Sequence, residues 1–201
     1  MKLHQLNPIP ILTTDIPVKK EWLEIADQFK YIRMATGNGN YTEDKYVLNK
    51  LPDLRLEIAK VIEQFARDIL KINKKIGFKF LNSWINIHGH KDFSYSHYHS
   101  NSLFSGVYYL KCEEGQGFLE FNNNKYNNHL SSLFHFEYDE LNLINNSLHR
   151  FNARSGNLII FPSSIPHSVS INNSQEKRYS LAFNAFPFGK FGEPESQINL
   201  E

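Results

Sequence analysis

His97 and His99, two histidines separated by one residue, are the clearest chemical feature of the sequence. Side chains alternate between the faces of an extended strand, so imidazoles at positions i and i+2 point the same way. Such a pair offers half of a first-row metal site. A third histidine, His167, lies just after the strand-like segment 156–162, far along the chain. The sequence therefore predicts a metal centre formed by these three histidines.

A second pair with the same spacing, His88 and His90, flanks Gly89 at the expected end of a strand. A turn at the glycine would separate the directions of the two side chains. We therefore expect His88 and His90 either to face solvent or to support the metal ligands without binding metal.

An arginine and a serine, Arg178 and Ser180, follow the third histidine. The turn-forming residues 172–176 predict an antiparallel hairpin that brings Arg178 within a couple of positions of direct opposition to His167. Arg178 and Ser180 would share one face of the second strand, and the apolar residues around them would take the other. A guanidinium and a hydroxyl beside a metal ligand suit a bound carboxylate.

The elements that must position these residues begin with helices. Pro17 precedes a short segment with apolar residues at helical spacing, and Pro52 is placed to start a longer helix whose apolar stripe runs to Ile72. That helix is expected to end near Gly77. Residues 8–13 read as an extended edge segment, because proline is tolerated there, and residues 35–46 read as a loop.

From residue 78 onward the pattern changes to short strands. The expected strands are 80–88, 94–99, 103–112, 117–122, 132–137, 148–152, 157–161, 167–171 and 177–184. Many short strands with polar turns are typical of a barrel or a two-sheet jelly roll. The asparagine-rich stretch 122–147 is expected to form surface loops around a hairpin. We predict one domain, 1–201, with a mostly helical part at 1–77 and a β core at 78–201.

Bulk composition excludes several classes of protein. A net charge of +1 provides no global field for nucleic acid or an anionic membrane. No segment approaches the roughly 18 uninterrupted apolar residues of a membrane span, and the first residues make a poor signal peptide. A single cysteine, Cys112, excludes an internal disulfide and fits a reducing compartment. A cytoplasmic protein without nucleic-acid or membrane partners is expected.

The sequence also resembles the 2-oxoglutarate/Fe(II)-dependent oxygenases, within which it is most similar to a branch of marine phages and bacteria with HxH in place of HxD. The resemblance covers most of the chain from about residue 46 and is carried by residues 46–56, 83–86, 97–110, 156–162, 166–167 and 178–184. It implies a double-stranded β-helix (jelly-roll) core, mainly β, with N-terminal helices packed on one sheet. It further implies Fe(II), 2-oxoglutarate as co-substrate, and O₂.

The resemblance also implies roles for individual residues. By position, His97 and His167 would bind iron, and Arg178 and Ser180 would hold the distal carboxylate of 2-oxoglutarate. Tyr109 would add a hydrogen bond to that carboxylate. The expected reaction is hydroxylation of an unidentified small-molecule or peptidyl substrate, with release of succinate and CO₂. No catalytic residue beyond the metal ligands is expected, and members of this superfamily often pair, which allows a homodimer.

Asn86 and His99 each have two possible roles. Asn86, on a strand expected to line the cavity, would either contact the co-substrate or lie on the strand surface as an ordinary amide. His99 occupies the position where the superfamily usually has Asp or Glu. Either His99 completes a three-histidine set, or it does not bind and the iron keeps an extra water or anion. We favour ligation, because the branch with the greatest similarity carries histidine at both places.

Two other classes fit parts of the pattern. Cupin dioxygenases or isomerases share the barrel, the HxH pair and a later histidine, but no glutamate follows His99 at the short interval expected of them, and Arg178 would have no role. A non-enzymatic jelly-roll binding module with vestigial histidines is the third interpretation.

Overall fold

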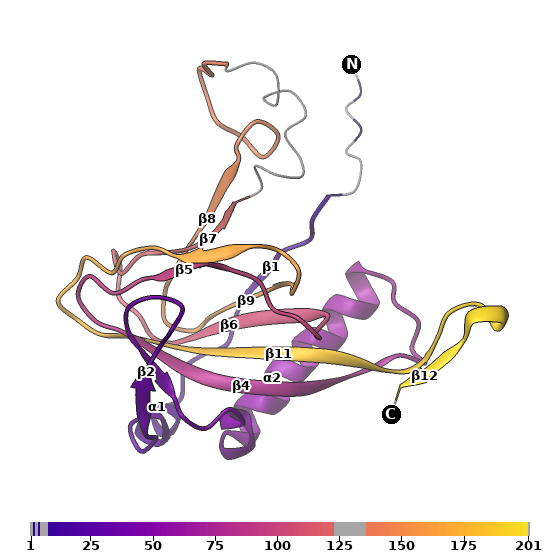
Figure 1. Cartoon of the computed structure of the whole chain (residues 1–201), viewed down its shortest axis with the longest axis horizontal. Coiled ribbons are helices and arrows are strands. Elements are labelled where there is room, and N and C mark those ends of the chain that lie inside the picture. The colour runs from indigo at the N-terminus through magenta and orange to yellow at the C-terminus, as the bar shows by residue number, and fades with distance from the viewer. Residues whose placement is uncertain (1, 3, 5–7, 123–135, 201) are drawn as a thin grey trace.

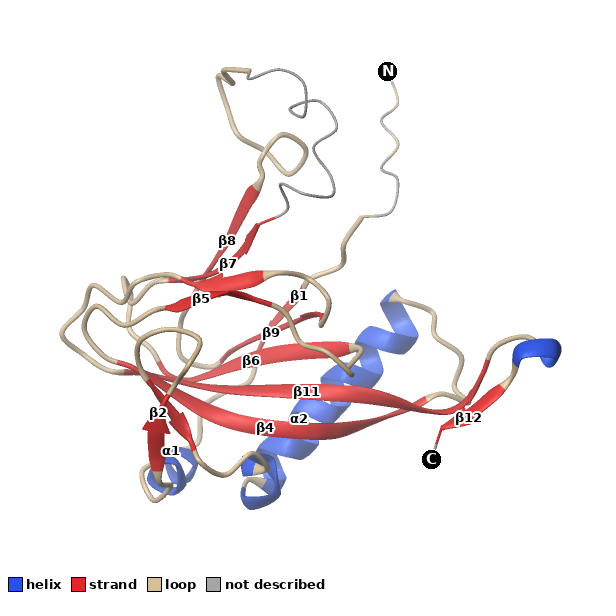
Figure 2. Cartoon of the chain, viewed as in Figure 1, coloured by secondary structure: helices blue, strands red, loops and turns tan. Residues whose placement is uncertain are grey.

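The computed structural model describes residues 2, 4, 8–122 and 136–200. Two antiparallel sheets face one another, and the helices cover the outer side of the larger sheet (Figures 1 and 2). The large sheet contains, in spatial order, β1 (Leu12–Asp15), β9 (Asn157–Pro162), β6 (Phe104–Lys111), β11 (Arg178–Phe191), β4 (Gly77–His88), β3 (Asn40–Thr42) and β2 (Tyr31–Arg33), with β12 (Ile198–Leu200) on the far end of β11. The small sheet contains β5 (Ser94–His97), β10 (His167–Val169), β7 (Phe118–Asn122) and β8 (Leu148–Asn152). This arrangement confirms the predicted jelly-roll class.

Two α-helices, α1 (Lys20–Ala26) and α2 (Pro52–Gln64), pack on the large sheet. In α2 the proline occupies the first turn, and Leu54, Ile58 and Ile62 recur every four residues and are buried. A π-helical turn, η2 (Phe65–Ile69), continues α2, and 3-10 turns lie at η1 (Val47–Lys50) and η3 (Pro194–Ser196).

The described residues form two apolar cores. The first lies between the helices and the outer face of the large sheet, and it includes Ile85, Leu181 and Phe183. The second lies around the opposite face and includes Leu119 and Phe121 of the small sheet. Successive residues of β4, β6 and β11 therefore alternate between a helix-facing side and a side that faces the small sheet.

Several sequence-based expectations are wrong in detail. Residues 35–46 were expected as loop, yet β3 falls within them, and it pairs with β2 and β4. The long helical segment ends at Ile69, earlier than Gly77, because the chain reverses at Lys71, whose φ is 57°. Arg67 donates hydrogen bonds to carbonyls of this reversal, which holds the loop in place.

The predicted hairpin between the segments of His167 and Arg178 is also wrong. Strand β10 pairs with β5 and β7 in the small sheet, whereas β11 pairs with β4 and β6 in the large one. The connecting residues cross from one sheet to the other. Asn172, fully buried, donates from its side chain to the carbonyls of His88 and Glu176 and so anchors the crossing.

Two predictions stay open. Most of the expected strand 132–137 lies outside the described residues, and its last two residues, 136 and 137, are not in a strand. The division into a helical part and a β core within one domain stays a prediction, although β1, β2 and β3 of the first part join the large sheet.

Candidate metal and co-substrate site

Three imidazoles converge between the two sheets. His97 ends β5 and is the register partner of His167, the first residue of β10. His99 lies in the loop after β5, where its backbone N–H donates to the carbonyl of Ser163 at 3.0 Å. One nitrogen from each of the three rings lies within 4.8 Å of the other two. The structure thus brings together the three histidines that the sequence analysis proposed as metal ligands.

Backbone carbonyls orient two of the rings. The Nδ1 atom of His97 lies 2.7 Å from the carbonyl oxygen of Tyr95, and the Nδ1 atom of His167 lies 3.0 Å from that of Ile165. A carbonyl oxygen only accepts hydrogen bonds, so Nδ1 must carry the proton in both rings. The lone pair on Nε2 is then free for a metal, as in metal sites whose histidines are oriented by an outer hydrogen bond. This donor set fits a first-row metal such as Fe(II).

Burial keeps two of these imidazoles neutral. Burial, with a smaller contribution from the nearby His97, lowers the pKa of His167 to about 3 and that of His99 to about 4. A neutral imidazole is the form that binds metal, because the lone pair is available only when the ring has lost its second proton. No protonation therefore competes with metal at these two positions near neutral pH.

Aromatic side chains surround the cluster. The indole of Trp84 packs edge-on against His99 with 5.7 Å between ring centroids. Phe161 and Phe121 lie 4.7 Å and 6.2 Å from the ring of His167. Trp84 is partly buried, packs against the first core and also contacts a proposed ligand.

The inner face of the large sheet carries a row of polar residues that leads away from the metal cluster. The registers place Trp84 opposite Ala182, Asn86 opposite Ser180, and His88 opposite Arg178. Tyr109 of β6 lies on the other side of Ser180. Trp84 touches His99, so the pair Asn86 and Ser180, with Tyr109, lies between the metal cluster and Arg178. 

Arg178 is almost completely buried, with 1% of its surface exposed. Its Nη1 donates to the carbonyl of Gln116, whereas Nε and Nη2 have no hydrogen-bond partner among the described residues. Nε and Nη2 form one edge of the guanidinium, which matches the two oxygens of a carboxylate. An unpaired buried charge is costly, so this edge fits an anionic ligand such as a dicarboxylate.

Tyr109 and Ser180 are buried beside the arginine, and Asn86 is partly buried. Burial raises the pKa of Tyr109 to about 12, although the positive charge of Arg178 opposes this rise. The phenol therefore keeps its proton and can donate a hydrogen bond to a carboxylate. All four co-substrate residues named from the sequence thus lie on one inner face.

Two residues near the arginine were missed or misjudged. Gln116 fixes the guanidinium through its backbone carbonyl, an interaction that carries no side-chain signal in a sequence. His88 is 1% exposed, which excludes the solvent-facing alternative for this residue and leaves the supporting one, while His90 is exposed.

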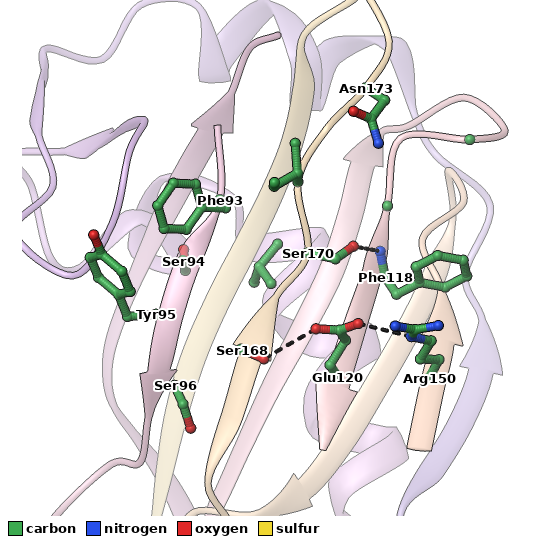
Figure 3. A pocket seen from close by; sticks show the side chains of 14 residues that line it. Phe93, Ser94, Tyr95, Ser96, Phe118, Glu120, Arg150, Ser168, Ser170 and Asn173 are labelled. Carbon is green, nitrogen blue, oxygen red and sulfur yellow. Dashed lines mark hydrogen bonds and ion pairs between the residues drawn. The ribbon is translucent and has the colours of Figure 1, made fainter. Parts of the chain in front are cut away.

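A separate hollow of about 580 Å³ lies on the opposite face of the small sheet (Figure 3). Glu120 forms an ion pair with Arg150 there, and Ser168 donates to the same carboxylate. These residues alternate with His167 and Phe121 along β10 and β7, so they point away from the metal cluster.

Comparison with known proteins decides the family. The family model described as "Putative 2OG-Fe(II) oxygenase" matches residues 82–184, just over half of the chain. The chain belongs to this family of 2-oxoglutarate/Fe(II) oxygenases. The matched segment includes all seven residues that we assigned to the metal and the co-substrate. No curated protein matches the sequence.

Solved structures share the fold at low sequence identity. HygX from Streptomyces hygroscopicus, solved with nickel and 2-oxoglutarate bound, is 12% identical with a TM-score of 0.58, and the alignment covers 96% of this chain and 93% of that one. A prolyl-4-hydroxylase from Pseudomonas putida is 13% identical with a TM-score of 0.53, covering 88% and 92%. SnoN, an α-ketoglutarate-dependent epimerase of nogalamycin biosynthesis, is 13% identical with a TM-score of 0.59, covering 89% and 78%.

Family membership favours the oxygenase interpretation over the cupin and the binding module. The family uses Fe(II), 2-oxoglutarate and O₂, and the protein is an oxidoreductase. Among the described residues, every helix is too short or too polar to span a lipid bilayer.

Proposed function

We propose that this oxygenase hydroxylates a C–H bond of a small-molecule or peptidyl substrate while 2-oxoglutarate is converted to succinate and CO₂. His97, His99 and His167 would hold Fe(II). Arg178, Ser180 and Tyr109 would hold the distal carboxylate of 2-oxoglutarate, with Asn86 as a further polar contact. These residue roles are part of the proposal.

One observation carries the assignment of the co-substrate. The buried Arg178 presents Nε and Nη2 without a protein partner, on the same inner face that leads to the three histidines. A buried guanidinium with one free edge favours an anion, and 2-oxoglutarate would offer its distal carboxylate to the arginine and its 2-oxo acid end to the metal.

The protein's own residues would perform binding, orientation and exclusion of water. Bound Fe(II), with 2-oxoglutarate and O₂, supplies the oxidising power needed to break a C–H bond. The carbonyls of Tyr95 and Ile165 hold the ligand rings in one tautomer and one orientation. Trp84, Phe121 and Phe161 limit the access of water to the cluster. Arg178 fixes the co-substrate at its far end, which leaves the space above the metal for a substrate.

Hydroxylation is proposed as the outcome because it requires nothing from the protein beyond these parts. Proteins of similar fold include both a prolyl-4-hydroxylase and an epimerase, so the fold alone does not set the outcome. Incorporation of one atom of ¹⁸O from ¹⁸O₂ into the product would distinguish hydroxylation from epimerisation, which adds no oxygen.

The test is turnover of 2-oxoglutarate by the Fe(II)-loaded protein. We expect O₂-dependent formation of succinate and CO₂, at a low rate without substrate and a higher rate with it. His167→Ala should lose bound iron and this turnover, whereas His90→Ala, which changes an exposed histidine, should keep both. Absence of 2-oxoglutarate binding and of succinate in the loaded wild-type protein would reject the proposed function. Full iron occupancy in His167→Ala would remove this residue from the ligand set.

A further inference from the structure

His88, at the end of β4, is a buried histidine for which the proposed function so far has no role. Its side chain is 1% exposed, and its Nε2 lies 3.1 Å from the hydroxyl oxygen of Ser94. Its Nδ1 is buried and has no hydrogen-bond partner among the described residues. Buried polar atoms almost always have a partner, so an orphaned ring nitrogen requires an explanation.

The register places His88 next to Arg178. His88 and Arg178 are directly opposed on neighbouring strands. Directly opposed residues have Cβ atoms about 4.5–5.5 Å apart and point to the same side of a sheet. Three buried nitrogens without partners, Nδ1 of His88 with Nε and Nη2 of Arg178, therefore belong to neighbouring side chains on one inner face.

The charges around His88 and Arg178 favour a bound anion. Burial, together with the positive charge of Arg178, lowers the pKa of His88 to about 3, so the imidazole is neutral. Among the ion pairs of the described residues, none includes Arg178. The guanidinium charge is therefore uncompensated in the protein alone, and a neutral histidine beside it is free to act as a hydrogen-bond donor.

The contact between His88 and Ser94 allows two tautomers. The hydroxyl of Ser94 either donates to Nε2 of His88 at 3.1 Å, or accepts from Nε2–H while it donates to the thioether of Met34 at 3.7 Å. An anionic acceptor beside the guanidinium selects the first arrangement, because only there does Nδ1 carry the proton. In that tautomer Nδ1–H is a donor on the side chain that neighbours Arg178.

We propose that His88 is a further co-substrate-binding residue, which donates a hydrogen bond from Nδ1 to the distal carboxylate of 2-oxoglutarate beside Arg178. This inference rests on the proposed function. A carboxylate offers about four lone-pair positions, so both oxygens can bind the edge of the guanidinium and one can also accept from the imidazole. The pocket would select a co-substrate with a carboxylate at that end, because a ligand without one leaves three buried nitrogens unpaired.

The experiment compares two 2-oxo acids. 2-Oxobutyrate has the metal-binding end of 2-oxoglutarate but no distal carboxylate. Both acids are titrated without oxygen into Fe(II)-loaded protein, and binding is followed by the absorbance change on chelation of the iron. His88→Phe keeps a ring but has no donor, His88→Asn retains an N–H near the position of Nδ1, and His88→Gln retains a polar group toward Ser94 only.

We expect His88→Phe and His88→Gln to bind 2-oxoglutarate about tenfold more weakly, as for loss of a hydrogen bond to a charged group. Affinity for 2-oxobutyrate should stay within about twofold of the wild type. His88→Asn should recover most of the lost 2-oxoglutarate affinity. Metal content and the thermal unfolding midpoint of each variant show whether the site is intact.

Other outcomes would overturn the inference in distinguishable ways. Equal weakening of both acids would mean that His88 only supports the packing of the site. Unchanged affinity for 2-oxoglutarate in His88→Phe would mean that Nδ1 does not reach the carboxylate. If the wild type itself fails to prefer 2-oxoglutarate over 2-oxobutyrate, the assignment of the carboxylate pocket fails, and the proposed function fails with it.

Discussion

At the scale of single residues, the metal cluster is unusual in charge. The proposed ligands His97, His99 and His167 would all bind as neutral imidazoles, whereas a site with two histidines and one carboxylate carries one negative charge. With three histidines, the net charge of a bound divalent metal and its protein ligands would be about one unit more positive than with two histidines and one carboxylate. That charge should strengthen the attraction of the site for an anionic co-substrate and weaken its hold on the metal.

Substitution at His99 tests this charge difference. We expect His99→Asp to bind Fe(II) at least as tightly as the wild type, because the carboxylate is a metal ligand and adds a negative charge. His99→Ala, which removes the ligand, should bind more weakly. The measurement is iron content after dialysis, together with Fe(II) titration under anaerobic conditions. Equal iron affinity in His99→Ala and the wild type would show that His99 does not bind the metal.

Substitution at Arg178 tests the co-substrate pocket. Arg178→Ala should weaken 2-oxoglutarate binding by about 2–5 kcal/mol, as for removal of one partner from a buried charge pair. Arg178→Lys keeps the charge but not the paired N–H groups, so it should recover only part of the loss. Isothermal titration with 2-oxoglutarate gives the affinities. Arg150→Ala, on the opposite face of the small sheet, is the matched control and should bind normally. A normal affinity in Arg178→Ala would place the carboxylate elsewhere.

At the scale of elements, Gly106 in the middle of β6 leaves room for the ring of Phe183, its register partner on β11. An added Cβ at Gly106 would lie 2.6 Å from Cε1 of Phe183, whose ring is completely buried and has no space to move. Gly77 has the same relation to Phe188, with the added Cβ 2.6 Å from Cε1, but that phenylalanine is 39% exposed.

The two glycines therefore form a matched pair for a stability measurement. Gly106→Ala should lower the free energy of unfolding by about 1–3 kcal/mol, the usual cost of an overpacked core. Gly77→Ala should cost less, because Phe188 can rotate into solvent. Urea denaturation of both variants gives the difference. Equal stability of the two variants would show that Phe183 adjusts as easily as its exposed counterpart.

Local sequence patterns predict individual helices and strands, but they do not predict which strands pair. Proline positions and apolar spacing indicated α2, alternation indicated β4, and aromatic and β-branched residues indicated β6, because these signals come from neighbouring residues. The hairpin prediction failed because Asn172 and its neighbours have turn-forming chemistry in either case. Whether a turn joins two paired strands or carries the chain to another sheet depends on distant partners, here the carbonyl of His88.

At the scale of the whole molecule, the side chains of the candidate site could be predicted from the sequence, whereas the groups that orient them could not. The three histidines proposed as metal ligands and Arg178 have side chains whose chemistry is visible in a sequence. The contacts that orient them are backbone carbonyls of Tyr95, Ile165 and Gln116, and a carbonyl is present at every residue. The burial of His88 depends on the facing sheet and on the loop that carries Gly39, which lies against its ring.

Buried histidines link the stability of the whole metal-free protein to pH. The pKa of His88 is lowered by burial from its ordinary value of 6.5 to about 3, and that of His167 likewise. Above pH 6.5 these rings are neutral in both the folded and the unfolded chain and contribute no pH dependence. Between pH 6.5 and about 3 only the unfolded chain binds the protons, so the free energy of unfolding must fall as pH falls.

We therefore expect metal-free protein to lose stability below pH 6.5, with a slope of up to about 1.4 kcal/mol per pH unit for each such histidine. His88→Phe should reduce the slope by roughly the share of one histidine, because phenylalanine binds no proton in either state. His90→Gln, at an exposed position, should leave the slope unchanged. Urea denaturation from pH 5 to pH 8 measures all three proteins. If His88→Phe kept the full slope, His88 would take up its proton in the folded state, and the neutral donor beside Arg178 would have to be abandoned.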